Sequence, residues 1–353
     1  MSAEQYEIRT INLRRASERN QLKTFLLQEN LTLESDLDYA ICLMDGDRII
    51  GSGCASGNVL KCIAVDVDYQ GQALTNRIIS YLRLRGFHEG YSSLFLFTKP
   101  GNETVFSELG FFTLAKSPDA ILMENRSDGF QIYIDSLKIP DDSMPAASIV
   151  MNCNPFTLGH RYLIEKACGE NERVHLFVVK EDLSVFPFDQ RMSLIQEGCS
   201  DLKNLFIHEG RDYIISHATF PTYFIKDSKI INDSYARIDL DLFARRIAPA
   251  LSITKRYVGE EPFDVVTSRY NQLMKEILPE NGVDVVEIPR KSCSDGAVSA
   301  TKVRKAMADN RYGELKNWVP PTTYDFLLSE EGQKIGEIIK RKALSVAKES
   351  EQV

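Results

Sequence analysis

The pattern of apolar and polar positions divides the chain into two parts. In the first part, short apolar runs predict strands at Tyr6–Leu13, Tyr39–Met44 and Arg48–Ala55, and Asp45-Gly46 forms the hairpin turn between the last two. The other elements expected there are helices at 15–28 and 71–88, strands at 59–67 and 93–98, and a short helix with strand-like pieces up to 123. Hairpins mixed with helices in this way predict a separate α+β domain over residues 1–135.

The second part of the chain has a different pattern, in which strands alternate with amphipathic helices. A linker at 136–146, with two prolines and two aspartates, precedes it. Strands are expected at 149–152, 175–180, 204–209, 253–259 and 283–288, and helices near 160–169, 189–199, 235–248 and 266–278. From Tyr324 onward the chain has a helical pattern. This alternation predicts an α/β fold with a doubly wound parallel sheet over residues 147–353, which would bind ligands beyond the carboxyl ends of its strands.

Length and charge limit the classes of protein that the chain can be. Its 353 residues exceed the roughly 250–300 at which a single core stops growing, in agreement with two domains. A net charge of −8 argues against a nonspecific nucleic-acid surface, which needs clustered Lys and Arg. No apolar run approaches the roughly 18 residues of a membrane span, and the N-terminus lacks a signal-peptide core. We therefore expect a cytoplasmic protein without nucleic-acid or membrane partners.

The cysteines and histidines do not have the spacing of a metal site. The 7 cysteines contain no C-x-x-C pair, and the 5 histidines contain no H-x-x-x-H pair. We expect reduced thiols and no protein-ligated metal. Cys153 lies in a candidate phosphate loop, but no histidine and carboxylate can be assigned beside it to activate a nucleophile.

That loop, Met151–His160, is the strongest indication of chemistry in the chain. It joins an apolar strand to an amphipathic helix, so the free N–H groups and positive end of the helix would face an anion. Gly159 lets backbone approach a ligand, and His160 can donate a hydrogen bond to a phosphoryl oxygen. We expect Asn154 and Phe156 of the same loop to contact the bound nucleotide.

A second anion site is expected where the last helix of the predicted sheet begins. Ser299, Thr301 and Arg304 follow a short Ser/Gly loop after the final strand. Their hydroxyls, backbone N–H groups and guanidinium would face one anion. Alone, the segment is better explained as an ordinary helix cap with a solvated arginine. Paired with the first loop, it favours a triphosphate site.

Four more residues come from the expected carboxyl edge of the sheet. Lys180 ends the second strand, and Arg191 begins the following helix, where either cation could meet a triphosphate. Gly259 and Pro262 follow the fourth strand and could line an adenine pocket. In each case a solvated surface side chain or a plain turn explains the residue about equally well.

These residues resemble the nucleotidyltransferases that carry a T/H-x-G-H motif and a distal I-S-S-T-x-x-R motif. Thr157 to His160 matches the first motif, and Val298 to Arg304 matches the second, with Ala300 in place of a serine. The resemblance implies attack of an acceptor oxygen on the ATP α-phosphate, release of pyrophosphate and no covalent enzyme intermediate. It assigns Thr157 and His160 to the α-phosphate and Lys180 to the developing charge, with Mg²⁺ held mainly by phosphate oxygens and water.

A narrower resemblance, to the citrate lyase ligases, covers roughly residues 147–320. It is carried by the runs at 152–167, 176–182, 213–227, 247–263 and 298–304. It implies that ATP activates acetate as acetyl-adenylate, and that the acetyl group then passes to the thiol prosthetic group of the citrate lyase acyl carrier protein. The short nucleotidyltransferases lack a segment like 209–252. Five polar side chains of that segment could build an acetate or thiol site: Tyr213, His217, Tyr223, Lys226 and Asn232. Each of them could equally be an ordinary packing or surface group.

The first domain resembles the GNAT acetyltransferases. Gln70 to Thr75 lies where their pyrophosphate loop opens a helix, and Asn102, Phe106 and Leu109-Gly110-Phe111 match a later motif. Ala73 and Thr75 replace the small residues that let coenzyme A phosphates approach the backbone. We therefore expect a domain that docks the carrier arm or keeps only the fold, in preference to an active acetyltransferase.

Two other functions remain open from the sequence. One is a plain adenylyltransferase that acts on a pantetheine phosphate or a nucleotide. The other is a non-catalytic acyl-CoA or nucleotide sensor. The long insertion argues against the first, and the presence of both motifs argues against the second.

Overall fold

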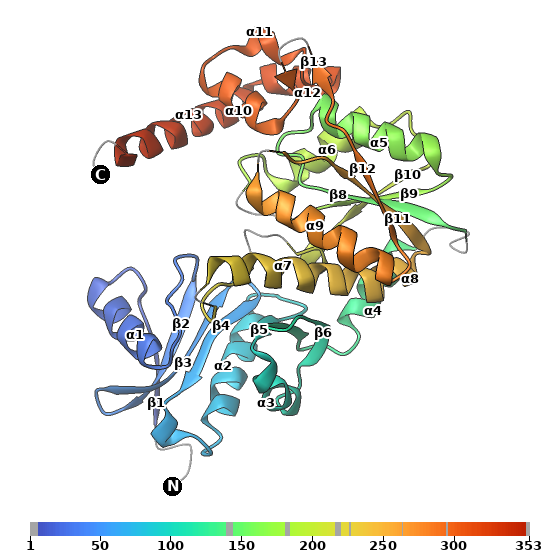
Figure 1. Ribbon diagram of the computed structural model, residues 1–353. Coiled ribbons are helices and arrows are strands. Elements are labelled where there is room, and N and C mark those ends of the chain that lie inside the picture. Colours follow the sequence, from blue (N-terminus) through green and yellow to red (C-terminus); the bar gives the residue numbers. More distant parts are fainter. Residues whose placement is uncertain are drawn as a thin grey trace. The chain divides into compact units, whose positions relative to one another are not determined.

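The chain folds into two compact units. The computed structural model describes residues 6–138, 144–180, 184–215, 220–225, 227–262, 264–293 and 296–350. The first unit consists of Met1–Ser136 and Phe220–Leu242, and the second of Leu137–Thr219 and Phe243–Val353 (Figure 1). The predicted linker at 136–146 lies partly outside the described residues.

The first unit is built on a seven-stranded mixed sheet in the order β1-β2-β3-β4-β5-β7-β6. Its strands are β1 (Glu7–Thr10), β2 (Tyr39–Asp45), β3 (Arg48–Ser56), β4 (Val59–Val65), β5 (Phe95–Thr98), β6 (Phe112–Lys116) and β7 (Ile121–Glu124). Its helices include α1 (Ala16–Gln28), α2 (Leu74–His88), α3 (Glu103–Glu108) and α4 (Gly129–Leu137), which runs past the boundary of the unit. The α+β architecture predicted from the hairpins is confirmed, and the hairpin turn lies between β2 and β3 as expected.

Strands β4 and β5 are parallel, while the other neighbours in this sheet are antiparallel. Among the described residues they pair only at Val59↔Phe95 and Leu60↔Leu96, near the start of both strands. A cavity of about 720 Å³ in the same unit is lined by residues of both strands. Gln70, Ala73, Thr75 and Asn102, taken above as GNAT-like positions, also line it.

Segment 220–242 belongs to the first unit, although the sequence pattern assigned it to the second domain. The Tyr223 hydroxyl donates to the Phe97 carbonyl at 2.8 Å, and the Thr32 N–H donates to the Tyr223 carbonyl at 2.9 Å. The Phe220 ring meets the Phe97 ring edge-on, with centroids 5.1 Å apart. Helix α7 (Ser228–Leu242) follows, and its Asp241 accepts from the Lys116 N–H at 3.0 Å. The domain boundary was wrong here because these contacts are non-local.

The second unit contains a five-stranded, all-parallel sheet in the order β10-β9-β8-β11-β12, which confirms the predicted doubly wound fold. The strands are β8 (Ala146–Met151), β9 (Val174–Val178), β10 (Leu205–Glu209), β11 (Ile253–Gly259) and β12 (Asp284–Ile288). The helices between them include α5 (Leu158–Glu170), α6 (Phe188–Gly198) and α9 (Val265–Glu280). The chain proceeds from β8 to β9 on one side and returns to β11 on the other, so the strand order reverses between β8 and β11. Ligands bind at such a switch point in open α/β sheets.

A helical C-terminal part completes this unit. A short hairpin, β13 (Ser292–Cys293) and β14 (Gly296–Ala297), leads into α10 (Ala300–Ala308). Helices α11 (Tyr312–Leu315), α12 (Pro321–Leu328) and α13 (Glu330–Ser350) follow (Figure 1). Trp318, only 1% exposed, lies in their apolar core. The helix expected at 235–248 instead ends as α7 at Leu242, and a π-helical turn, Phe243–Ile247, continues into α8 (Ala248–Ala250).

We predict that truncation of Tyr223 destabilises the first unit. Tyr223→Ala removes a buried ring and its bond to Phe97, and should lower the free energy of unfolding by about 3–5 kcal/mol. The exposed Phe87→Ala is the control and should change it by less than about 1 kcal/mol. Urea unfolding followed by circular dichroism checks both values. A Tyr223→Ala loss no larger than that of the control would contradict the packing described for this segment.

Candidate active site

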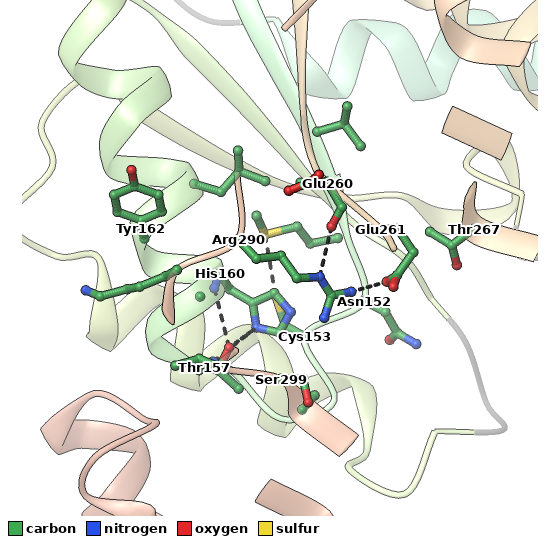
Figure 2. Close-up of a pocket in the computed structure, with 18 of the residues that line it drawn as sticks. Asn152, Cys153, Thr157, His160, Tyr162, Glu260, Glu261, Thr267, Arg290 and Ser299 are labelled. Carbon is green, nitrogen blue, oxygen red and sulfur yellow. Dashed lines mark hydrogen bonds and ion pairs between the residues drawn. The ribbon is translucent and has the colours of Figure 1, made fainter. Parts of the chain in front are cut away.

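A cavity of about 800 Å³ lies at the carboxyl ends of β8 and β11, where the strand order reverses. Residues from the loop after β8, the start of α5, the loop after β11, the segment after β12 and the start of α10 line it (Figure 2). Both predicted anion-binding segments thus open into one cavity. Eight of the predicted site residues line it: Asn154, Thr157, Gly159, His160, Gly259, Ser299, Thr301 and Arg304.

Thr157 and His160 form a reciprocal cap at the start of α5. The Thr157 hydroxyl accepts from the His160 backbone N–H, and the Thr157 N–H donates to His160 Nδ1 at 3.1 Å. Because a backbone N–H can only donate, Nδ1 must carry a lone pair. Neutral His160 therefore holds its proton on Nε2 and can donate it to a ligand.

The His160 side chain is held in this neutral form. Burial, together with the positive charges of Arg290 and Arg304, lowers the pKa of His160 to about 4. Its ring stacks on that of Phe156, with centroids 6.1 Å apart and planes 11° from parallel. At neutral pH the site therefore presents a neutral, fixed donor whose orientation does not depend on titration.

The second predicted segment meets the first directly. Ser299 caps α10 by accepting from the Lys302 N–H at 3.1 Å. The Arg304 guanidinium donates to the Asn154 carbonyl and, at 3.1 Å, to the Thr301 hydroxyl. A Cβ atom on Gly159 would lie 3.3 Å from the Val298 carbonyl, closer than most real contacts. Gly159 thus allows the close approach of the two motifs as well as access to a ligand.

Four predicted site residues do not line the cavity: Phe156, Lys180, Arg191 and Pro262. Lys180 is exposed after β9, and Pro262 is exposed after β11. Phe156 is fully buried in the core beneath the loop. The roles predicted for Lys180 and Pro262 stay predictions, whereas the burial of Phe156 does not agree with direct contact to the nucleotide.

Arg191 lies inside the protein, which the sequence did not indicate. Its side chain is fully buried, and its guanidinium donates to the carbonyls of Asn152 at 2.7 Å, Val179 at 2.8 Å and Phe186 at 3.2 Å. The prediction that Arg191 faces a triphosphate was wrong, because these main-chain acceptors hold it inside the protein.

Cys153 is a buried part of the cavity wall, and the described residues of the insertion divide between the two units. Cys153 reaches the wall of the cavity but is only 1% exposed, and burial raises the pKa of its thiol, so it is not an activated nucleophile. Tyr213 belongs to the second unit, whereas Tyr223 and Asn232 belong to the first. His217 and Lys226 lie outside the described residues.

Sequence reasoning missed several charged residues that line the cavity, among them Arg290, Glu260 and Glu261. Arg290 follows β12, and Glu260 and Glu261 follow β11. Arg290 donates to the Glu260 carbonyl at 2.9 Å and forms an ion pair with Glu261. The rule that selected Lys180, a charged residue after a parallel strand, also applies to Arg290 and would have found it.

Neither a membrane-spanning helix nor a metal-binding cluster is present in the described part of the chain. No helix there is long and apolar enough to cross a membrane. No three side chains of His, Cys, Asp or Glu converge there in a way that could hold a metal ion.

Comparison with known proteins places these features in a family. The family model for the citrate lyase ligase C-terminal domain matches residues 146–327. A [citrate [pro-3S]-lyase] ligase from Klebsiella pneumoniae is 42% identical over 88% of this chain and 92% of its own length. The chain belongs to the citrate lyase ligase family. A second member, from Haemophilus influenzae, is 40% identical over 87% of this chain and 94% of its own length.

More distant relatives match only part of the chain. A phosphopantetheine adenylyltransferase from Finegoldia magna is 25% identical over 38% of this chain and 89% of its own length. A solved bifunctional NMN adenylyltransferase/ADP ribose pyrophosphatase from Francisella tularensis covers 59% of this chain and 55% of its own, at 16% identity and a TM-score of 0.39. An acyl-CoA N-acyltransferase from Pseudomonas aeruginosa covers 34% of this chain and 99% of its own, at 11% identity and a TM-score of 0.29.

Substitution of Arg191 should mainly lower stability, whereas substitution of Arg304 should mainly weaken ATP binding. Arg191→Met leaves buried carbonyls without a donor and should cost about 3 kcal/mol of unfolding free energy. Its effect on ATP affinity should be smaller than that of Arg304→Met, which should weaken ATP binding about 10- to 100-fold. Denaturant unfolding and calorimetric titration with ATP measure these quantities. A stable Arg191→Met protein with strongly weakened ATP binding would restore the original prediction for this residue.

The lowered pKa of His160 predicts an acid-labile contribution to stability. The unfolded chain binds a proton near pH 6.5 and the folded chain only near pH 4, so the stabilisation is complete above 6.5 and is lost as pH falls toward 4. Between pH 7.5 and 5, wild type should lose roughly 1–2 kcal/mol more than His160→Gln. Urea unfolding at both pH values checks this difference. His175, whose pKa burial also lowers to about 4, is present in both proteins and cancels in the comparison. Equal losses in the two proteins would contradict a neutral, buried His160.

Proposed function

We propose that this chain uses ATP to acetylate the thiol prosthetic group of the citrate lyase acyl carrier protein. The reaction proceeds through acetyl-adenylate and releases pyrophosphate and AMP. Membership of the citrate lyase ligase family supports the overall activity. One structural observation carries the adenylation chemistry: the Thr157–His160 cap and the Ser299–Arg304 segment open into one cavity at the strand switch point.

In the first step, an acetate oxygen attacks the α-phosphorus of ATP, the bond to the bridging oxygen breaks, and pyrophosphate leaves. We assign the Nε2–H of His160 to an α-phosphate oxygen, because its proton is fixed there by the Thr157 N–H. The Arg304 guanidinium and the start of α10 lie where they can bind the departing phosphates. No proton has to move in this step, which suits a histidine that stays neutral.

In the second step, the carrier thiolate attacks the carbonyl carbon of acetyl-adenylate. The C–S bond forms, the C–O bond to the phosphate breaks, and AMP leaves. The thiol has lost its proton to solvent before this attack, so the charges balance when the phosphate of AMP leaves as an anion. The same fixed donors would then stabilise the charge on the departing phosphate.

We propose that Mg²⁺ enters with ATP and is held mainly by phosphate oxygens and water. The carboxylates that line the cavity support this view, because Glu261 is paired with Arg290 and Asp264 caps α9 by accepting from the Thr267 N–H at 2.7 Å. The proposed partners are acetate and the acyl carrier protein, and the proposed location is the cytoplasm.

The experiment that tests this function is acetate-dependent exchange of labelled pyrophosphate into ATP, followed by mass measurement of the thiol-form carrier protein. Wild type should catalyse exchange only with acetate and add one acetyl group to the carrier. His160→Ala should lower the exchange rate by about 10²- to 10³-fold, because a fixed donor to the phosphate is lost. Exchange that needs a pantetheine phosphate in place of acetate would instead establish an adenylyltransferase. ATP binding with no exchange on any carboxylate would favour a sensor.

A further inference from the structure

We propose that Arg290 binds the carboxylate of the acyl substrate, and that this carboxylate takes the place of Glu261 on the guanidinium. The proposal rests on the function proposed above and assigns a specificity-determining residue to its first step. It places the acetate carboxylate beside the α-phosphate that it attacks.

The first support is the position of Arg290 in the cavity. It follows β12, and its side chain reaches into the cavity with Glu260 and Glu261 on one side and His160 close by (Figure 2). Its side chain is 24% exposed, and that of Glu261 is 13% exposed. The positive charge of Arg290 lowers the pKa of His160 more than that of Arg304 does. The guanidinium therefore lies near the group assigned to the reacting phosphate.

The second support is that the guanidinium already holds a carboxylate. Glu261 forms an ion pair with it, while the Glu260 carbonyl fixes its Nε–H at 2.9 Å. A planar guanidinium binds a carboxylate through two parallel hydrogen bonds, and this geometry does not distinguish a side chain from a free carboxylate. The Glu261 carboxylate thus marks a position that acetate can occupy.

The third support is the difference in charge between the two ends of the cavity. The wall after β11 carries Glu260, Glu261 and Asp264, and these carboxylates would repel a polyphosphate. The end at α10 brings Ser299, Thr301 and Arg304 and the positive start of a helix. Among the described residues, the triphosphate is better accommodated at the α10 end, and Arg290 is suited to a single negative charge.

Exchange of one carboxylate for another also avoids a buried, uncompensated charge. Removing one partner of a partly buried ion pair is costly, whereas replacement by an equivalent anion keeps the charges balanced. Glu261 follows β11 in a loop, and its carboxylate also accepts from the Asp264 N–H at 3.2 Å, so it keeps a partner when the substrate takes its place on the guanidinium. A small acyl group fits this exchange, because its methyl group occupies little of the space beside His160.

The test uses Arg290→Gln and Arg290→Lys in the full-length protein. In acetate-dependent pyrophosphate exchange, Arg290→Gln should raise the KM for acetate about 10- to 100-fold. ATP affinity, measured by calorimetry without acetate, should stay within about threefold. Arg290→Lys should recover part of the acetate affinity, since it keeps the charge but not the planar fork. The control is Arg311→Gln, which removes an arginine paired with Asp309 and Glu314 outside the cavity and should change neither constant.

Glu261→Gln separates substrate binding from a purely structural ion pair. If Glu261 competes with acetate for Arg290, this variant should lower the KM for acetate severalfold. If the pair only stabilises the loop, Glu261→Gln and Arg290→Gln should raise that KM together, which would overturn the proposal. Loss of ATP affinity by tenfold or more in Arg290→Gln, with an unchanged KM for acetate, would overturn it as well. Wild type without acetate-dependent exchange would overturn the proposed function itself.

Discussion

The candidate active site depends on one buried guanidinium, that of Arg191, which donates hydrogen bonds to main-chain carbonyls. Arg191 binds the carbonyl of Asn152 beyond β8 and that of Val179 beyond β9, and it also holds Phe186 ahead of α6. Two connections at the carboxyl edge of the sheet, the one after β8 and both ends of the one after β9, are thereby tied to one rigid, planar group. A charge that is fully buried is stable only when its hydrogen bonds are all made, so the loops cannot shift independently of one another.

The phosphate loop is held from its other side by the second motif. Asn154 accepts from the Phe186 N–H through its side chain at 3.1 Å and from Arg304 through its carbonyl. The loop is therefore held between an inner arginine, Arg191, and an arginine of the cavity wall, Arg304. This double attachment places Thr157 and His160 before any ligand arrives, which is the condition for electrostatic preorganisation. Arg191 donates to main-chain carbonyls inside the protein, whereas Arg304 lines the cavity.

The sequence predicted those parts of the structure that depend on local order along the chain. The alternation of strands and helices and the carboxyl edge of the sheet follow from local spacing, and both predicted anion-binding segments line the cavity. It did not predict which arginine faces the ligand. Arg191 and Arg304 are both near helix starts, and only three-dimensional packing decides that one bonds carbonyls inside the protein while the other reaches the wall of the cavity. Segment 220–242 was misassigned for the same reason, because its partners Thr32 and Phe97 are distant in the chain.

Segment 220–242 also affects the order in which the chain can fold during synthesis. Residues up to Ser136 leave the ribosome first, but the first unit lacks Tyr223 and α7 until Leu242 has been made. By then β8, β9 and β10 have emerged, whereas β11, the parallel neighbour of β8, follows only at Ile253–Gly259. Domains commonly fold one after another from the N-terminus. Here the first unit has all seven strands by Glu124 but waits for α7 until Leu242, about two thirds of the way along the chain. Over that interval the nascent chain must keep a first sheet that lacks α7 and an unfinished second sheet from pairing wrongly.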